Sequence, residues 1–479
     1  MNMFSSFIKK IIPKSFLNRF RPIYHYLFSF LAHVFYGKAS NKIIVIGVTG
    51  TSGKTSSVYL MAKTLNNAGY KTGYTSTAMF SDGNNEWLNN KKMTMLGKFF
   101  TQKMLNKMVK NKCVYAVIET TSEGIKQFRH RFINYDVVCF TSLYPEHIES
   151  HGSFENYKQA KAKLFSHLKN CKTKYVDGNK RVVKIKTNLS KINFNKVKKT
   201  IIVNGDDEHS FFFSGFWAEE KLFYYKGDFA DKDENVIFYN NILVDKNEIS
   251  FDVLFKQKLS SDNGMTNKRV SLSLLGEFNV LNSMPLLALS VNQEINLDLI
   301  LDKLKEIKNI PGRLEIVDAG QKFLAIVDYA YEPVAMKKLY NTIDFIRENR
   351  KEKGKIIHIL GSTGGGRDKS RRFTLGEIAG EKADFVIISN EDPYDENPLD
   401  IINQVASGSK AVGKIEGENL FRVLDRREAI KKSLSLVGDN DIVLLTGKGS
   451  EQAICVAGGK KIKWDDRVVL RGEIINKVV

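Results

Sequence analysis

The chain has 479 residues, 43% of them hydrophobic and 26% charged, which suits several packed domains and excludes a disordered or fibrous protein. Its 73 Lys and Arg exceed its 53 Asp and Glu by 20, which suits anionic substrates, a membrane surface or nucleic acid, although a compositional bias of the whole chain explains the excess equally well. Four cysteines without a CxxC pair argue against a disulfide framework or zinc site and indicate a cytoplasmic protein.

Residues 1–40 differ in composition from the rest of the chain. The basic residues Lys9, Lys10, Lys14, Arg19 and Arg21 precede "PIYHYLFSFLAHVFYG", a stretch without formal charge. A membrane-spanning helix needs roughly 20 apolar residues, so the stretch is short for a span, whereas basic and aromatic flanks are typical of interfacial helices. We expect a short helical segment that touches a membrane surface or packs on a protein surface; a true span is the third alternative.

The stretch "IIVIGVTGTSGKTSSVYLMAKTL", residues 43–65, predicts a strand, a glycine-rich loop and a helix. Such a loop surrounds phosphates with backbone N–H groups at a helix N-terminus. Lys54 is expected to reach the β- and γ-phosphates of a nucleotide, and the Thr55 hydroxyl to hold Mg²⁺. The spacing departs from the strict motif, because Val48 occupies the first glycine position. The expected nucleotide contacts are Gly50, Thr51, Ser52, Gly53, Lys54, Thr55 and Ser56.

Three polar side chains follow the loop in an order that suggests metal chemistry. Glu119 ends the apolar run "YAVIE", His147 follows the run "DVVCFTSL", and Lys161 lies in the helical pattern beyond it. Each alone is an ordinary cap or loop residue. Together, behind a phosphate loop, Glu119 and His147 predict carboxylate and imidazole ligands of two metal ions. Residues 172–199 carry ten Lys and Arg and one Asp, which favours a solvated insertion over a nucleic-acid site.

The alternation of short β-branched runs with helical patterns predicts an α/β protein. We expect a central phosphate-loop domain with a mostly parallel sheet at 41–310, after the helical segment 1–40. "IPGRLEIV" begins a second, Rossmann-like α/β domain at 311–479, where apolar strands again end in glycine-rich loops.

These motifs, in this order, resemble the Mur ligases, ATP-dependent amide-forming enzymes of peptidoglycan synthesis, and most of all the branch that adds the third amino acid. The resemblance covers about residues 42–475. It rests on "GVTGTSGKTS", "ETTSEG", "EHIESHGSFENYKQAK", "VNGDD", "GEFNVLN", "PGRLE", "VDYAYEP", "GGGRDKSRR", "NEDPYDENP" and "GKGSEQ".

The resemblance implies a role for each matching position. Thr55 and Glu119 hold one Mg²⁺, while His147 and a carbamoylated Lys161 hold a second. Lys54, Glu119, His147 and Lys161 form the catalytic set. The further ATP contacts are Asn282, Arg313 and Asp328. The substrate contacts are Thr94, Thr121, Ser122, Arg367, Asp392, Tyr394, Gly447 and Glu451.

The resemblance also implies a reaction and its partners. A substrate carboxylate attacks the γ-phosphate of ATP, and the amine of an amino acid then displaces phosphate from the acyl phosphate. Two cations and Lys54 offset the repulsion between carboxylate and polyphosphate. The expected partners are ATP, an amino acid and a muramoyl-peptide-type acceptor, with no nucleic acid. The protein is expected to be a cytoplasmic monomer, with contact at the inner face of the membrane through residues 1–40 as an option.

Several positions depart from the family pattern. Glu146 stands for an aspartate, Glu123 and Tyr331 stand for histidines, and Ser450 replaces another histidine. Tyr394 takes the place of the arginine that grips the distal carboxylate of diaminopimelate, and a phenol cannot form that bidentate pair. Lysine or another diamine is therefore as plausible a substrate as diaminopimelate.

The family normally has a UDP-binding domain before the phosphate loop, where this sequence has 40 residues. The expectation is that the uridine part is bound differently, with another protein's help, or is absent. Two alternatives stay open: a related ligase with a folate-type or lipid-linked acceptor, and a non-catalytic nucleotide-binding protein at the membrane.

Overall fold

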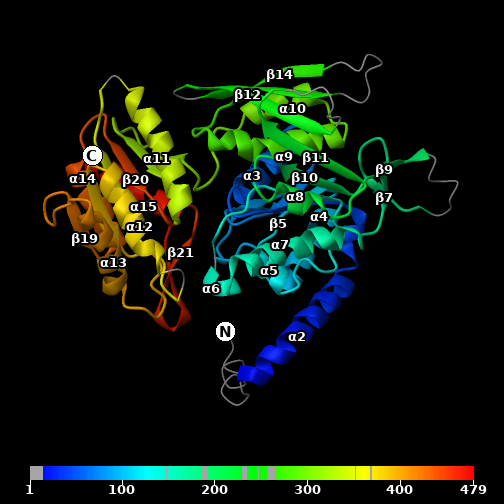
Figure 1. Ribbon diagram of the computed structural model, residues 1–479, viewed down its shortest axis with the longest axis horizontal. Helices are drawn as coiled ribbons and strands as arrows, with labels where there is room; N and C mark the ends of the chain where they lie inside the picture. Colours follow the sequence, from blue (N-terminus) through cyan, green and yellow to red (C-terminus); the bar gives the residue numbers. More distant parts are fainter. Residues whose placement is uncertain are drawn as a thin grey trace.

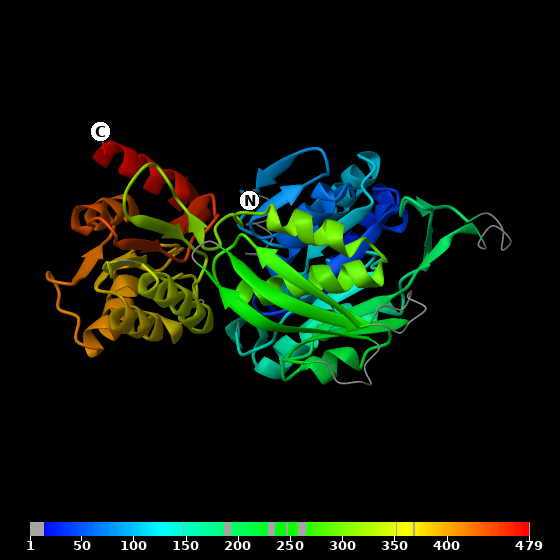
Figure 2. The same cartoon turned by 90° about the horizontal axis from the view of Figure 1, so that it is seen from above.

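The computed structural model describes residues 14–146, 148–185, 193–228, 235–245, 248–256, 265–350, 352–366 and 369–478. The chain forms two large sheets, one in the blue-to-green half and one in the yellow-to-red half, each with helices on both faces (Figures 1 and 2). This arrangement confirms the predicted α/β class with two sheet-bearing units.

The first sheet has eleven strands. In spatial order they are β14 (Met265–Leu272), β13 (Ile249–Lys256), β12 (Val236–Val244), β11 (Glu220–Lys226), β10 (Thr200–Asn204), β6 (Val137–Phe140), β1 (Ile44–Thr49), β5 (Tyr115–Glu119), β2 (Thr72–Thr75), β3 (Met79–Ser81) and β4 (Glu86–Leu88). The pairs from β12 through β2 are parallel, and the pairs at the two edges are antiparallel. The prediction of a mostly parallel sheet is thus confirmed.

Helices cover both faces of this sheet because its central strands are apolar on both sides. Ile44, Ile46 and Val48 of β1 pack in one core with α3 (Lys54–Asn67), α9 (Phe278–Asn292) and α10 (Leu297–Lys305). Val45 faces the opposite core, with α4 (Lys98–Lys110), α5 (Ser122–Lys126), α7 (Phe154–Leu168) and α8 (Ser210–Ser214). The strand ends at Thr49 and Glu119 therefore open onto one edge of the sheet.

The second sheet has six strands, in the order β15 (Glu315–Ile316), β16 (Leu324–Val327), β20 (Ile442–Leu445), β17 (Ile356–Leu360), β18 (Phe385–Ser389) and β19 (Leu420–Val423). All its pairs except β15–β16 are parallel. One face carries α11 (Pro333–Glu348), α12 (Arg371–Lys382) and α13 (Pro398–Ala411), and the other carries α14 (Arg426–Leu436) and α15 (Asp466–Val478). The predicted boundary at residue 310 stays a prediction; α10 ends at Lys305 and β15 begins at Glu315.

The remaining elements are small or lie at the edge. The N-terminal helix α2 (Lys14–Phe35) and the turn η1 (Ala39–Lys42) lie against α4. The short helix α6 (Ile148–His151) precedes α7. The hairpin β21 (Ala453–Val456) and β22 (Lys460–Lys463), with the turn η3 (Ala457–Gly459) between them, follows β20. The strands β8 (Val182–Val183), β7 (Lys174–Val176) and β9 (Asn195–Val197) form a separate small sheet.

This small sheet corrects part of one prediction. Residues 172–199 were expected to form a solvated insertion, but Lys174 and Lys199 are buried. Both ammonium groups bond to the buried Asp136 carboxylate, at 2.5 Å and 2.8 Å. Two buried cations need such a partner, because an isolated charge is costly away from water. Two lysines of this lysine-rich segment therefore form a buried structural ion cluster with Asp136, which the composition of the segment does not indicate.

Candidate active site

The phosphate loop connects β1 to α3. Gly53 has φ +79° directly before the helix, and a Cβ there would lie 2.7 Å from Asn282 Oδ1, so this position favours glycine. Lys54 Nζ donates to the carbonyl oxygens of Gly50 (3.0 Å) and Thr51 (2.7 Å). Burial lowers the pKa of Lys54, and the nearby Glu119 carboxylate opposes this shift. The unpaired N–H groups at the start of α3 and the Lys54 ammonium together favour an anion.

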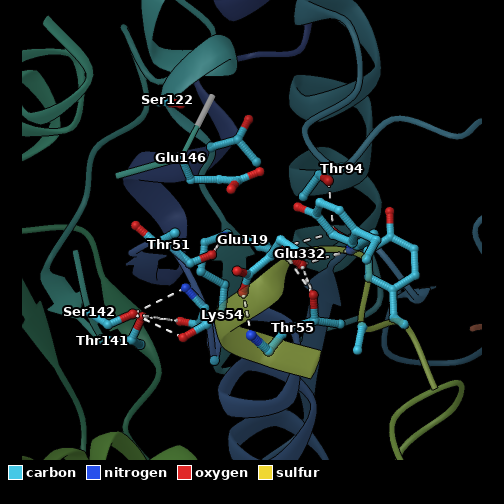
Figure 3. A pocket seen from close by; sticks show the side chains of 18 of the residues that line it. Thr51, Lys54, Thr55, Thr94, Glu119, Ser122, Thr141, Ser142, Glu146 and Glu332 are labelled. Atoms are coloured by element: carbon cyan, nitrogen blue, oxygen red, sulfur yellow. Dashed lines mark hydrogen bonds between the residues drawn. The ribbon is translucent and has the colours of Figure 1, made fainter. Parts of the chain in front are cut away.

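Glu119 ends β5 and is buried beside this loop. Thr55 Oγ1 donates to both of its carboxylate oxygens, at 3.1 Å and 3.0 Å (Figure 3). Thr77 adds two more bonds, from its backbone N–H at 2.7 Å and its hydroxyl at 2.9 Å. A buried carboxylate needs such donors or a cation. Glu119 and the Thr55 hydroxyl thus present oxygen ligands, the kind that Mg²⁺ prefers, next to the phosphate loop.

Lys161 lies on α7, directly behind the phosphate loop, and its exposed fraction is only 1%. Its Nζ donates to the carbonyl oxygen of Gly50 at 2.5 Å and lies 4.4 Å from the centre of the Tyr157 ring. Burial lowers the pKa of Lys161 well below its usual value, and the Lys54 ammonium lowers it further. Lys54 and Lys161 therefore donate to the same acceptor, the carbonyl oxygen of Gly50.

The two sheet-bearing units meet at the phosphate loop. Arg313 follows the first unit, and its Nη2 lies 3.4 Å from Thr55 Oγ1 while its guanidinium lies over the Tyr329 ring. Tyr144 of the first unit donates to Glu332 Oε1 at the start of α11, at 2.8 Å. These contacts place groups of the second unit within reach of a nucleotide on the loop.

Two further contacts hold the same junction. Asp328, at the end of β16, accepts from the backbone N–H groups of Leu314 and Ala330, both at 2.7 Å, and burial raises its pKa. Arg371 of α12 lies 3.5 Å from Glu146, in the first unit. The hydrogen bond from Leu314 to Asp328 thereby fixes residues 313–314 against the second sheet, and Arg313 lies next to the phosphate loop.

A cluster of opposite charges lies at the far end of the same pocket. Lys448 Nζ donates to Asp392 Oδ1 at 3.0 Å and to Glu451 Oε2 at 2.9 Å. Lys92, from the first unit, also pairs with Asp392 and lies 2.8 Å from Glu451. Burial opposes ionisation of Asp392, but the Lys448 and Lys92 ammonium groups outweigh it and lower its pKa. Gly447, with φ +96°, approaches the buried Glu391 so closely that a Cβ would lie 2.3 Å from Oε2.

The expected substrate contacts of the first unit lie between these two ends. Thr94 shares a 2.7 Å hydrogen bond with Thr77, which in turn bonds Glu119. Ser122 Oγ lies 3.2 Å from His151 Nε2, and Thr121 caps α5 by accepting from the N–H of Gly124. Thr94 is thus two hydrogen bonds away from Glu119 and three from Thr55.

One pocket of about 740 Å³ joins these groups. Most of the residues expected from the sequence line it: Thr51, Ser52, Gly53, Lys54, Thr55, Ser56, Thr94, Glu119, Thr121, Ser122, Asn282, Arg313, Asp328, Asp392, Tyr394, Gly447 and Glu451. Gly50 and Lys161 lie just behind the lining, one hydrogen bond from Lys54 or from each other. His147 and Arg367 lie outside the described residues. Within the described ranges, no three His, Cys, Asp or Glu side chains cluster as a metal site.

Several lining residues were not expected from the sequence. Lys92, Tyr144, Tyr329, Glu332, Arg371 and Glu391 all line the pocket. Glu332 precedes Pro333 and caps α11, so its local pattern indicates only a helix start. Lys92 lies in the polar run "LNNKKM", which carries no signal for a partner that is 300 residues distant. "RDKSRR", which contains Arg371, is a basic cluster that could have been assigned to the anionic substrates.

A phosphate loop, a buried acid bonded to its threonine and a pocket lined by two sheet-bearing units are the features of the nucleotide-dependent α/β enzymes. The family models for the Mur ligase middle domain and for the Mur ligase glutamate ligase domain match residues 48–198 and 312–449. The UDP-N-acetylmuramyl-tripeptide synthetase of Borreliella burgdorferi is 33% identical over 93% of this chain and 79% of its own length. A diaminopimelate-adding ligase of Fusobacterium nucleatum is 31% identical over 94% and 81%.

This chain belongs to the Mur ligase family, whose members are ATP-dependent ligases of amino acids that use Mg²⁺. It is accordingly an ATP-dependent ligase that forms a bond between a carboxylate and an amine. Solved structures share the fold. A diaminopimelate-adding Mur ligase has a TM-score of 0.56 at 23% identity, covering 91% of this chain and 79% of that one. Folylpolyglutamate synthase of Mycobacterium tuberculosis has a TM-score of 0.63 at 15% identity, covering 88% and 92%.

Proposed function

We propose that this ligase adds an amino acid to a UDP-muramoyl-peptide-type acceptor through an acyl phosphate, in peptidoglycan precursor synthesis. One observation carries the proposal: Glu119 and Arg313, from separate units of the chain, both approach the Thr55 hydroxyl at the phosphate loop. The 33% identity to a UDP-N-acetylmuramyl-tripeptide synthetase supports the choice of acceptor.

The proposed nucleotide site is the loop from Gly50 to Ser56, with its phosphates at the start of α3. Lys54 pairs with the β- and γ-phosphates once it releases its two loop carbonyl oxygens. Asn282 takes the adenine side, which its position beside Gly53 supports, since a Cβ at Gly53 would lie 2.7 Å from Asn282 Oδ1. Arg313 and Asp328 complete the site from the second unit.

We assign two Mg²⁺ ions and a carbamoyl group to residues near the phosphate loop. The Thr55 hydroxyl and the Glu119 carboxylate would hold the first ion, since hard cations prefer oxygen ligands. His147 and the carbamoylated Lys161 would hold the second. Carbamoylation joins a neutral amine to CO₂ with loss of one proton, and the lowered pKa of the buried Lys161 supports that neutral form. When bound, the ions would supply positive charge beside the phosphates.

The proposed chemistry follows from charge. The acceptor carboxylate attacks the γ-phosphorus of ATP, which forms an acyl phosphate and releases ADP. Lys54, Arg313 and the N-terminus of α3 lower the repulsion between the two anions. The amine of the amino acid then attacks the acyl carbon, the bond to phosphate breaks, and the amine loses a proton to a base.

The amino acid is proposed to lie at the far end of the pocket, against Arg367, Asp392, Tyr394, Gly447 and Glu451. Asp392 and Glu451 already bind ammonium groups, from Lys92 and Lys448, which supports a substrate amine there. The acceptor lies between the two ends, along Thr94, Thr121 and Ser122. We propose that the protein works as a cytoplasmic monomer, divided at residues 40 and 310, with residues 1–40 at the inner face of the membrane.

The test is ADP release from the full chain with ATP, Mg²⁺, UDP-muramoyl-dipeptide and one amino acid at a time. The expected result is stimulation by lysine or a related diamine, with a peptide product of matching mass. Bound nucleotide measured by calorimetry serves as a control for a folded site. No stimulation by any amino acid, in protein that binds ATP, would reject this acceptor.

A further inference from the structure

The helix α2 carries apolar side chains on the side that faces away from the protein. Ile23, Leu27, Leu31 and Phe35 follow one another at a spacing of four residues, and each is at least half exposed. Residues at this spacing lie on one face of a helix. Tyr24, Tyr26, Phe28, Phe30 and Val34 flank this stripe and are 37–51% exposed, although Tyr26, Phe28 and Phe30 also contact aromatic rings of the first unit along one edge. We call these nine residues the α2 free face.

The opposite side of α2 is more polar than the α2 free face. Ser29 is buried, and its hydroxyl lies 3.0 Å from the carbonyl oxygen of Phe128. His25 bonds to Lys98 of α4, and Ala32 is fully buried. A surface helix of a water-soluble domain shows the reverse order, with its apolar stripe toward the core. The α2 free face is therefore suited to contact with an apolar surface outside the first unit.

The charged residues of α2 and of the sequence next to it are of one sign. The chain has no Asp or Glu before Asp82, whereas Lys9, Lys10, Lys14, Arg19, Arg21 and Lys38 lie in or next to the helical segment in the sequence. Phe99 of α4 contacts Phe28 and Phe35 of α2, and the exposed Lys103 follows it by one helical turn. An apolar, aromatic surface bordered by cations complements an anionic lipid surface.

No helix in the described part of the chain has the length and apolarity of a membrane span. Tyr24, Tyr26 and the phenylalanines suit the interface, where amphipathic rings lie at headgroup depth. We infer that the α2 free face docks in the plane of an anionic bilayer surface. The inference deepens the proposed placement of residues 1–40 at a membrane, because it names the face of α2 that binds and the charge of the lipids. It rests on the proposed ligase function only for the purpose of that binding.

Docking there has a consequence for the pocket. Tyr26 contacts Phe128, and the next residue, Arg129, lines the pocket together with Met93. In Figure 1, α2 extends from the lower end of the first unit, whereas β12 lies at its upper end. The pocket edge at Arg129 would therefore lie close to the membrane surface, within reach of an acceptor that is itself at the bilayer.

The test is sedimentation of the full chain with vesicles. Equal parts of phosphatidylglycerol and phosphatidylcholine form the anionic vesicles, and phosphatidylcholine alone forms the neutral ones. We expect binding to the anionic vesicles, about ten-fold weaker binding to neutral ones, and a similar loss at about 0.5 M NaCl. The double variant Leu27→Ser and Leu31→Ser should lose about ten-fold in binding, because binding scales with the buried apolar area. Leu243→Ser, at a leucine of β12 that is 64% exposed against 50% for Leu27 and 51% for Leu31, is the control and should bind like the wild type.

Two readouts keep the inference separate from the proposed function. ADP release with a soluble acceptor should be the same in the double variant and the wild type. A loss of this activity would therefore concern the proposed ligase function and would not test the binding of α2 to membranes. If the double variant fails to fold, the single variant Leu31→Trp replaces it, and its fluorescence should shift to the blue with anionic vesicles only. Equal vesicle binding by wild type and double variant, no fluorescence shift, or a dimer that the double variant abolishes would overturn the inference.

Discussion

The ammonium group of Lys92, in the loop after β4, pairs with Asp392, which follows β18 in the second unit. The same ammonium lies 2.8 Å from Glu451, and the Lys92 side chain is only 4% exposed. Burial would lower the pKa of Lys92, but the two carboxylates outweigh it and raise the pKa above its usual value. The two units are thus joined by a charged side chain in the place that we assign to the amine of the incoming amino acid.

We predict that Lys92→Met lowers the KM for the amino acid by about five-fold, because a site filled by Lys92 is available for only part of the time. The methionine keeps a long side chain in the pocket and removes the charge. The measurement is the initial rate of ADP release against amino acid concentration. Lys91→Met changes the exposed neighbouring side chain and is the control. A higher KM in Lys92→Met would show instead that Lys92 binds a carboxylate of the substrate.

The sequence was enough to predict that Lys54 and Glu119 lie together at one edge of the first sheet. Lys54 and Glu119 end or follow parallel strands, and such strand ends meet at one edge of a sheet whatever the details of packing. The Lys92–Asp392 pair could not be predicted in this way, because it depends on how two units close over the pocket. The burial of Lys174 and Lys199 was also hidden, since their partner Asp136 lies outside the lysine-rich segment.

The second prediction concerns the Glu119 carboxylate. Glu119→Gln keeps the shape of the side chain but removes its charge, so we expect the rate of ADP release to fall about a hundred-fold or more. ATP binding should weaken in the presence of Mg²⁺ and change little in its absence, which calorimetry with and without a chelator can measure. Glu155→Gln, on the exposed side of α7, is the control. A variant with wild-type turnover would remove Glu119 from the proposed metal site.

The carbamate on Lys161 can be tested by mass and by rescue. Intact protein in bicarbonate buffer should carry one added carbamoyl group that Lys161→Ala lacks. Lys161→Ala should bind ATP and lose ligation, and a small carboxylic acid should restore part of the activity, because it supplies the missing anionic oxygens to the cavity. Full activity without the acid would contradict the assigned role.

The depressed pKa of Lys161 also predicts a pH dependence of stability in CO₂-free buffer. In the unfolded chain the lysine keeps its proton up to a pKa near 10.5, whereas the folded protein loses it at a lower pH. Between these values the unfolded state binds more protons, so the free energy of unfolding rises with pH, by at most about 1.4 kcal/mol per unit. Urea unfolding at about pH 7 and about pH 9 should show a smaller rise for Lys161→Met than for the wild type. An equal rise in both proteins would mean that Lys161 is ionised in the folded state.

The last prediction concerns the choice of amino acid. Tyr394 lines the pocket next to Asp392, in the left-handed region with φ +51°, and its N–H donates to the Cys455 carbonyl at 3.1 Å. Tyr394→Arg leaves that backbone bond in place and adds a planar cation, which can form a bidentate pair with a distal carboxylate. We expect kcat/KM for diaminopimelate relative to lysine to rise about ten-fold, measured by competition between the two amino acids with product masses as the readout.

Tyr394→Phe, which removes only the hydroxyl, should leave the ratio within about two-fold of the wild type. If Tyr394→Arg also leaves the ratio unchanged, then the side chain at this position does not face the distal end of the amino acid, and specificity must be set by the carboxylates Asp392 and Glu451.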